Sequence, residues 1–322
     1  MNSHLSIWLA SALVISLGSL LVGIALGSVN LPFATVLHAL TGRETGLAAD
    51  IVWQLRLPRV LAAFACGGLL ALAGTLLQAL LRNPLADPYI LGVSGGSAVA
   101  ALAAMLFGLA AAAVNLAALG GALGAVGLVF ALGFGRGGSM VRLLLTGVVL
   151  SAGFGALISL LLTLAPGAEV RGMLFWLMGD LSQAQAPGVA WGILLAALAL
   201  AWWQAGSLDI LGLGEIKARS LGVAVRPLQL GIYFTASAAT AAVVVEAGAI
   251  GFVGLIVPHF VRLLGAGGHR RLLPLAVLAG GSFLTLADTL ARTVVAPQQL
   301  PVGVLTALLG VPLLLFLLAR KV

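Results

Sequence analysis

Ionisable side chains are scarce in this chain. Only 8% of its 322 residues are charged, whereas 61% are hydrophobic and the mean hydropathy is +1.19. A soluble globule of this size needs far more polar surface than these residues provide. The composition therefore predicts a protein that has the lipid bilayer as its solvent.

Cysteine, lysine and histidine are too few or too scattered for most soluble chemistry. Cys66 is the single cysteine, which excludes an intramolecular disulfide and a thiolate metal cluster. The only two lysines, Lys217 and Lys321, lie outside any G-x-x-x-x-G-K-[ST] phosphate-binding loop, and the four histidines show no metal-ligand spacing. The glycine-serine patches also lack the strand, turn and helix context of a nucleophile elbow. We therefore expect no enzyme activity and no metal or cofactor in this chain, and transport is the large class that remains.

The few charges mark the ends of membrane spans, because a charge at mid-bilayer costs at least about 2.5 kcal/mol. The uncharged run between Asp87 and Arg136 is about twice the roughly 20 residues that cross a bilayer, so it predicts a two-helix hairpin that turns near Val114 and Asn115. The sequence thus predicts an all-α polytopic membrane protein that forms a single transmembrane domain over 1–322. Ten spans are expected, at 5–27, 60–81, 90–111, 114–134, 142–164, 188–206, 228–246, 249–264, 272–291 and 303–319.

Basic residues are distributed unevenly between the loops. With the N-terminus inside, eleven of the sixteen Lys and Arg residues lie on the inner face, and Arg43, Arg56, Arg59, Arg171 and Arg292 lie on the outer face. Such an excess marks the cytoplasmic side, so both termini are expected in the cytoplasm. The first 27 residues have no Lys or Arg before their apolar stretch and are expected to form the first span rather than a cleaved signal. The net charge of +7 arises from dispersed loop residues, and no nucleic-acid partner is expected.

The segment 82–97 separates two long apolar runs with prolines and a charge pair. Pro84 and Pro88 remove backbone donors and push the preceding residues out of helical geometry, so the chain should turn between Arg82 and Asp87. The glycines and serines that follow leave the next helix with a face of small residues. Such a face suits close helix contact or a wide, mildly polar pathway.

The longest predicted inner loop, 206–229, alternates charged and apolar residues. Its glycines divide it into two short helical pieces, and Ile216 and Leu221 give these pieces an apolar side beside a charged one. This pattern fits a helix laid against a partner protein. It fits a helix resting on lipid headgroups equally well.

Seven ordered blocks of the chain resemble the FecCD-type permeases of bacterial ABC importers for ferric siderophores, haem and cobalamin. The blocks, which together run nearly end to end, are 54–59 (QLRLPR), 78–88 (QALLRNPLADP), 92–96 (GVSGG), 175–179 (FWLMG), 214–222 (GEIKARSLG), 251–262 (GFVGLIVPHFVR) and 300–310 (LPVGVLTALLG).

The resemblance implies an ABC importer permease of the type II fold in the bacterial inner membrane. Its implied partners are a second copy of the chain, two cytoplasmic ATPase subunits that use ATP and Mg²⁺, and a periplasmic binding protein. The chain itself would carry no cofactor, and the missing phosphate-binding loop is what such a division of labour requires. In such permeases the loop that corresponds to 208–222 docks in the ATPase, which implies coupling roles for Leu213, Glu215, Lys217, Arg219 and Leu221. The resemblance does not name the chelate.

The resemblance also assigns the two ends of a pathway. The cytoplasmic gate would lie at Asn83, Leu85, Met140 and Val141, where two protomers meet; some relatives carry small hydroxyl residues at the last two positions, which puts the polarity of this gate in doubt. Outer-face arginines of similar permeases pair with carboxylates of the binding protein, which implies docking roles for Arg56, Arg59 and Arg292. Snorkelling to lipid phosphate is the alternative.

Soft and aromatic side chains follow the fifth predicted span. Met173, Phe175, Trp176 and Met178 could line an outer cavity for a large chelate, although Trp176 equally suits an interfacial aromatic belt.

Two carboxylates near span ends, Glu246 and Asp288, keep a competing hypothesis open. A proton-coupled secondary transporter would need ionisable groups at such depths. No inverted-repeat signature accompanies this pair.

Overall fold

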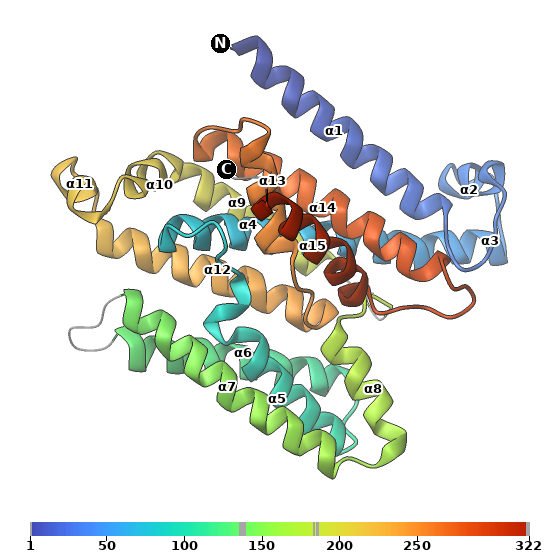
Figure 1. The fold of residues 1–322 in the computed structure, drawn as a ribbon. Helices are drawn as coiled ribbons and strands as arrows, with labels where there is room; N and C mark the ends of the chain where they lie inside the picture. The colour runs from blue at the N-terminus through green and yellow to red at the C-terminus, as the bar shows by residue number, and fades with distance from the viewer. Residues whose placement is uncertain (1, 135–139, 183, 185–186, 320–322) are drawn as a thin grey trace.

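The computed structural model describes residues 2–134, 140–182, 184 and 187–319, and their regular secondary structure is helical throughout (Figure 1). In chain order the elements are α1 (Asn2–Ala25), α2 (Phe33–Leu40), α3 (Leu47–Asp50), the π-helical η1 (Ile51–Arg56), α4 (Leu57–Leu81), the 3₁₀ turn η2 (Pro88–Leu91), α5 (Val93–Leu106), α6 (Ala111–Phe134), α7 (Met140–Leu164), α8 (Gly167–Met178), α9 (Gly188–Trp203), α10 (Ala205–Gly212), α11 (Glu215–Ser220), α12 (Val225–Ala247), α13 (Val253–Leu263), α14 (His269–Thr293) and α15 (Val302–Ala319).

Helix α4 forms the centre of the molecule, and α9, α12, α13 and α14 pack around it. Almost every residue of α4 is buried, which explains its continuous apolar sequence. Two glycines permit the closest approaches. A Cβ on Gly67 would lie 2.2 Å from the Gly280 carbonyl oxygen of α14, and a Cβ on Gly74 would lie 1.8 Å from the Gly254 carbonyl oxygen of α13. These helices therefore pack backbone to backbone, as small residues allow in membrane proteins.

Helices α5 and α6 form the predicted hairpin, and α7 packs against both. The hairpin turns at 107–110 rather than near Val114 and Asn115, because Gly108 adopts a positive φ of 66° there. A Cβ on Gly96 would lie 2.6 Å from the Gly121 carbonyl oxygen, so small residues set the α5–α6 contact.

The prediction of ten full spans needs correction. Within the described residues, six helices are long and apolar enough to cross a bilayer, and the α9–α10 pair, bent by 60°, brings the number to at most seven. The regions predicted as spans at 90–111, 249–264 and 303–319 contain shorter apolar helices instead. Helix α13, with 11 residues, rises only about 16 Å against a hydrocarbon core of about 30 Å. The predicted span 249–264 was too long because the apolar residues that precede α13 are not helical.

Short helices were also missed or shifted. Helices α2 and α8 were not predicted, although Pro32 and Pro166 directly precede them at the N-cap position. Helix α12 begins at Val225 rather than residue 228, so the predicted loop 206–229 shrinks to the segment around α10 and α11. The predicted turn after Arg82 is confirmed, since Arg82 ends α4 with a left-handed backbone (φ 49°).

Candidate functional site

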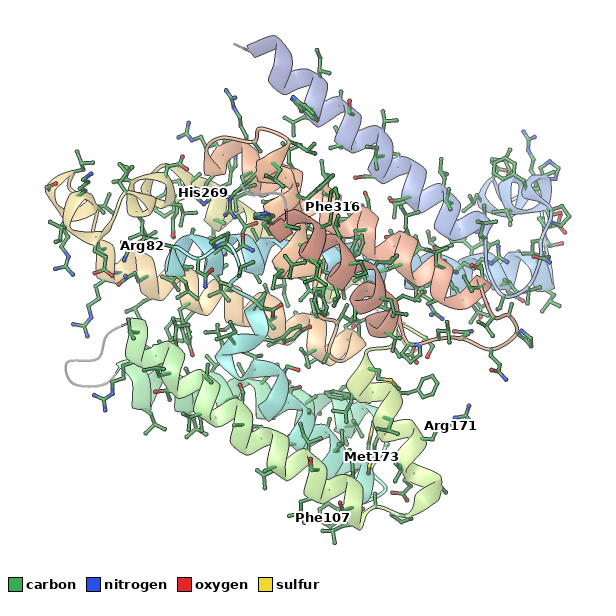
Figure 2. The ribbon with its side chains drawn as sticks, in the orientation of Figure 1. Arg82, Phe107, Arg171, Met173, His269 and Phe316 are labelled. Carbon is green, nitrogen blue, oxygen red and sulfur yellow. The ribbon has the colours of Figure 1, made fainter. Side chains whose placement is uncertain are left out.

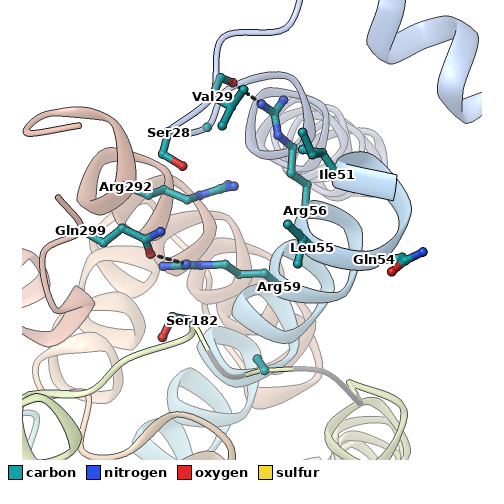
Figure 3. Close-up of a pocket in the computed structure, with 12 residues that line it drawn as sticks. Ser28, Val29, Ile51, Gln54, Leu55, Arg56, Arg59, Ser182, Arg292 and Gln299 are labelled. Atoms are coloured by element: carbon teal, nitrogen blue, oxygen red, sulfur yellow. Dashed lines mark hydrogen bonds between the residues drawn. The ribbon is translucent and has the colours of Figure 1, made fainter. Parts of the chain in front are cut away.

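An arginine pocket of about 200 Å³ lies where the end of α1, the start of α4 and the end of α14 meet (Figure 3). We use this name for the space lined by Gly27, Ser28, Val29, Ile51, Gln54, Leu55, Arg56, Arg59, Ser182, Ala184, Arg292 and Gln299. It contains all three arginines that the sequence assigned to docking. Their exposed fractions are only 4–8%, so they form the wall of the pocket rather than an exposed rim.

Arg59 and Arg292 share one buried carboxylate, Asp288. The Arg59 guanidinium donates to both Asp288 oxygens at 2.8–3.1 Å, and Arg292 Nε lies 3.2 Å from Asp288 Oδ2. Arg59 Nη1 also donates to Gln299 Oε1 at 2.7 Å, and Arg292 Nη2 donates to the Gly23 carbonyl at 2.7 Å. Asp288 thus joins α4 to α14 through two ion pairs, an arrangement that suits a structural role.

Arg56 caps the C-terminal end of α1. Its Nη1 donates to the carbonyls of Ile24 and Ala25 at 2.9 and 2.8 Å, and Nη2 donates to the Val29 carbonyl. A cation at this position satisfies carbonyls that the helix leaves unpaired and complements its dipole. The three arginines and Asp288 together give this region a net charge of +2, which favours an anionic group from outside.

A second cavity, which we call the carboxylate cavity, has a volume of about 770 Å³ between the ends of α5 and α12, the start of α6 and helix α8. Phe175 and Trp176, two of the four residues predicted to line a pathway, line this cavity. Met173 does not, because it is 1% exposed and packs inside the protein, and Met178 is only partly buried at the end of α8. Asp180 and Glu246 line the cavity as well.

The charged segment that the sequence predicted as an inner loop forms a projecting pair of helices, α10 and α11, at one end of the bundle (Figure 1). Leu213, Ile216 and Leu221 expose 60%, 88% and 61% of their surface. Within α11 the predicted pair is present but loose, with Glu215 Oε2 3.7 Å from Arg219 Nη2. Exposed apolar side chains beside charges indicate a contact surface.

Two contacts fasten this segment to the bundle. Gln229 Nε2 of α12 donates to Glu215 Oε1 at 2.9 Å, and Asp209 Oδ1 accepts from the His269 backbone N–H at 2.9 Å. The His269 ring lies against the same carboxylate, with Nδ1 2.6 Å from Asp209 Oδ1. These contacts join α10 and α11 to α12 and α14.

The turn at 82–92 lies near this end of the molecule. Figure 2 shows Arg82 and His269 toward it, whereas Phe107 and Arg171 lie toward the opposite end. Asn83 Oδ1 accepts from the Leu85 amide at 2.9 Å, and Asp87 Oδ1 accepts from the Tyr89 amide at 2.8 Å. Burial raises the pKa of the Asp87 carboxyl, and the hydrogen bond from the Tyr89 amide opposes this shift in part.

The predicted gate residues occupy this turn and the adjacent start of α7. Asn83 and Leu85 are exposed, and Val141 is 66% exposed. Met140 begins α7, and its side chain lies outside the described residues. Helix α7 is the least buried of the six long apolar helices, so much of its apolar surface lacks a covering element within the described chain.

Comparison with known proteins is consistent across sequence and structure. The profile of the FecCD transport family matches residues 13–320. A hemin transport system permease, HmuU of Yersinia pestis, is 40% identical over 312 residues, which cover 94% of this chain and 93% of the relative. The vitamin B12 import system permease BtuC of Escherichia coli O157:H7 (strain EC4115 / EHEC) is 40% identical over 285 residues, covering 84% of this chain and 83% of the relative.

A solved metal-chelate type ABC transporter in an inward-facing conformation has the same fold. It superimposes with a TM-score of 0.85 at 30% identity over 98% of this chain and 99% of that chain. Family profile, relatives and structure agree over nearly the whole length. The chain therefore belongs to the FecCD transport family.

Proposed function

We propose that this chain is the permease subunit of an ATP-driven importer that moves a large metal chelate, such as a ferric siderophore, haem or cobalamin, from periplasm to cytoplasm. The observation that carries this proposal is the end-to-end agreement with permeases for hemin and vitamin B12. The carboxylate cavity, at about 770 Å³, is of the size that ligand sites reach. We place both termini and the segment around α10 and α11 on the cytoplasmic side of the membrane, and the arginine pocket on the periplasmic side.

The ATPase partners would dock on α10 and α11. Leu213 and Leu221, with Ile216, provide the apolar part of the contact, and Glu215, Lys217 and Arg219 provide its charges. The anchors at Gln229 and His269 would carry the movement to α12 and α14, which supports a switch between inward- and outward-open states.

A second copy of the chain would cover α7. The exposed apolar residues of this helix include Val141, Leu145 and Val148, which are 53–66% exposed. Pairing two copies along this face would place the Val141 ends together near Asn83 and Leu85, where the inner gate is proposed. In such a two-fold symmetric contact, the same face of each copy forms both sides of the interface.

The arginine pocket would receive a carboxylate of a periplasmic binding protein. Its net charge of +2 and its opening at the ends of α1 and α14 support this role, while the burial of the arginines shows that they also hold these helices together. A carboxylate that enters the pocket would meet arginines whose positions are already fixed. Such preorganisation lowers the entropy lost on binding.

Two measurements separate this function from that of a carrier that hydrolyses ATP by itself and from that of a proton-driven carrier. The purified chain alone should neither bind nor hydrolyse ATP, whereas proteoliposomes that also contain its ATPase should accumulate a chelate only when ATP is supplied. A proton gradient should not replace ATP. Nucleotide turnover by the pure permease, or uptake driven by a proton gradient without the ATPase, would contradict the proposal.

A further inference from the structure

An apolar groove of about 520 Å³ separates the first half of α1 from α13 and α14. The second half of α1 packs tightly on α14, where Ser16 Oγ and Ser282 Oγ are 3.0 Å apart and a Cβ on Gly23 would touch Thr285. Toward its N-terminus α1 diverges from α14, as Figure 1 shows. The groove is the space that this divergence opens. It is open to the surface of the molecule, since Trp8 on its wall is 46% exposed.

The floor of the groove is a continuous stripe along one face of α14. Leu275, Ala279, Phe283 and Leu286 follow one another at intervals of four, four and three residues, which places them in line. Arg271 is one turn before Leu275 and also lines the groove. From Arg271 to Leu286 the helix rises about 22 Å, which exceeds the roughly 15 Å depth of hydrocarbon in one leaflet.

Arg271 supplies the one charge that lines this groove among the described residues. Its side chain is partly exposed, and it makes no hydrogen bond or ion pair with a described residue. The neighbouring Arg270 is different, because its guanidinium lies over the Trp202 ring at 5.8 Å from the centroid, away from the groove. The structure thus places the Arg271 guanidinium, which has no partner among the described residues, at the end of this apolar groove.

We propose that this groove binds an anionic phospholipid, with the phosphate on Arg271 and an acyl chain along Leu275, Ala279, Phe283 and Leu286. A guanidinium pairs well with phosphate, and basic residues between helices at the cytoplasmic side are suited to anionic headgroups. An acyl chain needs no hydrogen bonds, whereas an extended peptide in this position would leave its backbone groups unpaired in an apolar site. The site does not depend on the transport function. In the orientation proposed above it lies in the cytoplasmic leaflet.

Trp8 provides a reporter for the test, because it lines the groove. The purified full-length chain is reconstituted with phospholipids whose acyl chains carry bromine, which quenches tryptophan fluorescence on contact. Brominated phosphatidylglycerol and brominated phosphatidylcholine are compared at equal mole fraction, and the Trp8→Phe variant isolates the Trp8 signal. We expect the anionic lipid to occupy the site with about fivefold preference, the factor that one basic residue contributes near anionic lipid.

Two variants and a control decide the site. Arg271→Gln should bring the preference close to one, and Ala279→Leu should remove it by filling the floor of the groove. Arg270→Gln is the matched control, since it removes the same charge one residue away and should keep the preference. Far-ultraviolet circular dichroism checks that each variant is folded.

Three outcomes would overturn the proposal. Equal quenching of Trp8 by the two lipids in the unmodified chain would show no headgroup selectivity. Equal losses in Arg270→Gln and Arg271→Gln would assign the effect to general surface charge. No quenching of Trp8 by either lipid would show that no acyl chain enters the groove.

Discussion

The arginine pocket makes a quantitative prediction about Arg59 that differs from that for a surface docking residue. Replacing Arg59 with alanine leaves Asp288, which is 1% exposed, with Arg292 as its remaining ion-pair partner. Removing one member of a buried ion pair costs about 3–5 kcal/mol of folding free energy when the remaining charge has no partner, and because Arg292 still pairs with Asp288 we expect a cost at the lower end of this range. An exposed docking salt bridge would contribute at most about 1 kcal/mol. Arg59→Ala should therefore destabilise the chain more than it weakens the docking of a binding protein.

Equilibrium unfolding in mixed detergent micelles measures this cost, and a double-mutant cycle assigns it to the pair. Replacing both partners, as Arg59→Met with Asp288→Leu, still leaves Arg292 without its carboxylate, so we expect a loss of stability that is smaller than the sum of the two single losses rather than a full recovery. The single variants Arg59→Met and Asp288→Leu complete the cycle. Asp288→Leu should be destabilising, since it leaves two arginines without their carboxylate. If Arg59→Ala unfolds at the same detergent composition as the unmodified chain, the pair does not stabilise the fold and our reasoning is wrong.

Three further predictions concern packing, coupling and docking. Gly74→Ala places a Cβ where a backbone carbonyl of α13 lies and should destabilise the chain by at least about 1–3 kcal/mol in the same unfolding assay, whereas Gly120→Ala, which meets nothing within 4 Å, should not. Exchanging the charges of α11, as Glu215→Lys with Arg219→Glu, should leave the chain folded but abolish ATP-driven uptake in proteoliposomes; normal uptake would assign α11 to the membrane surface. Alanine at two of the three pocket arginines should weaken docking of the binding protein on an immobilised permease and make it less sensitive to salt, because screening acts only on charges that are present. Equal salt sensitivity before and after would place the docking site elsewhere.

Local signals in the sequence predicted much of the fold. The prolines of 82–88 predicted the turn after α4, and the uncharged run before Arg136 predicted the α5–α6 hairpin. The sequence could not show that 249–252 is non-helical, since those residues are as apolar as the helix that follows. Family resemblance suggested docking roles for Arg56, Arg59 and Arg292, which stay a prediction, and it gave no sign that these side chains are buried. Asp288 lies 229 residues from Arg59 in the chain, and no local pattern indicates such a pairing.

The contacts of the buried arginines explain how three positive charges are tolerated in the interior of this end of the bundle. Arg56 is neutralised in part by carbonyls at the end of α1, and Arg59 and Arg292 by Asp288. Each pairing also joins helices that are distant in sequence. The charges that stabilise this end of the bundle therefore also determine the electrostatic potential in the arginine pocket. One carboxylate for three arginines leaves the pocket short of negative charge. A carboxylate supplied by another protein would lower this net charge from +2 to +1, so we expect the pocket to prefer acidic groups although its three arginines are buried.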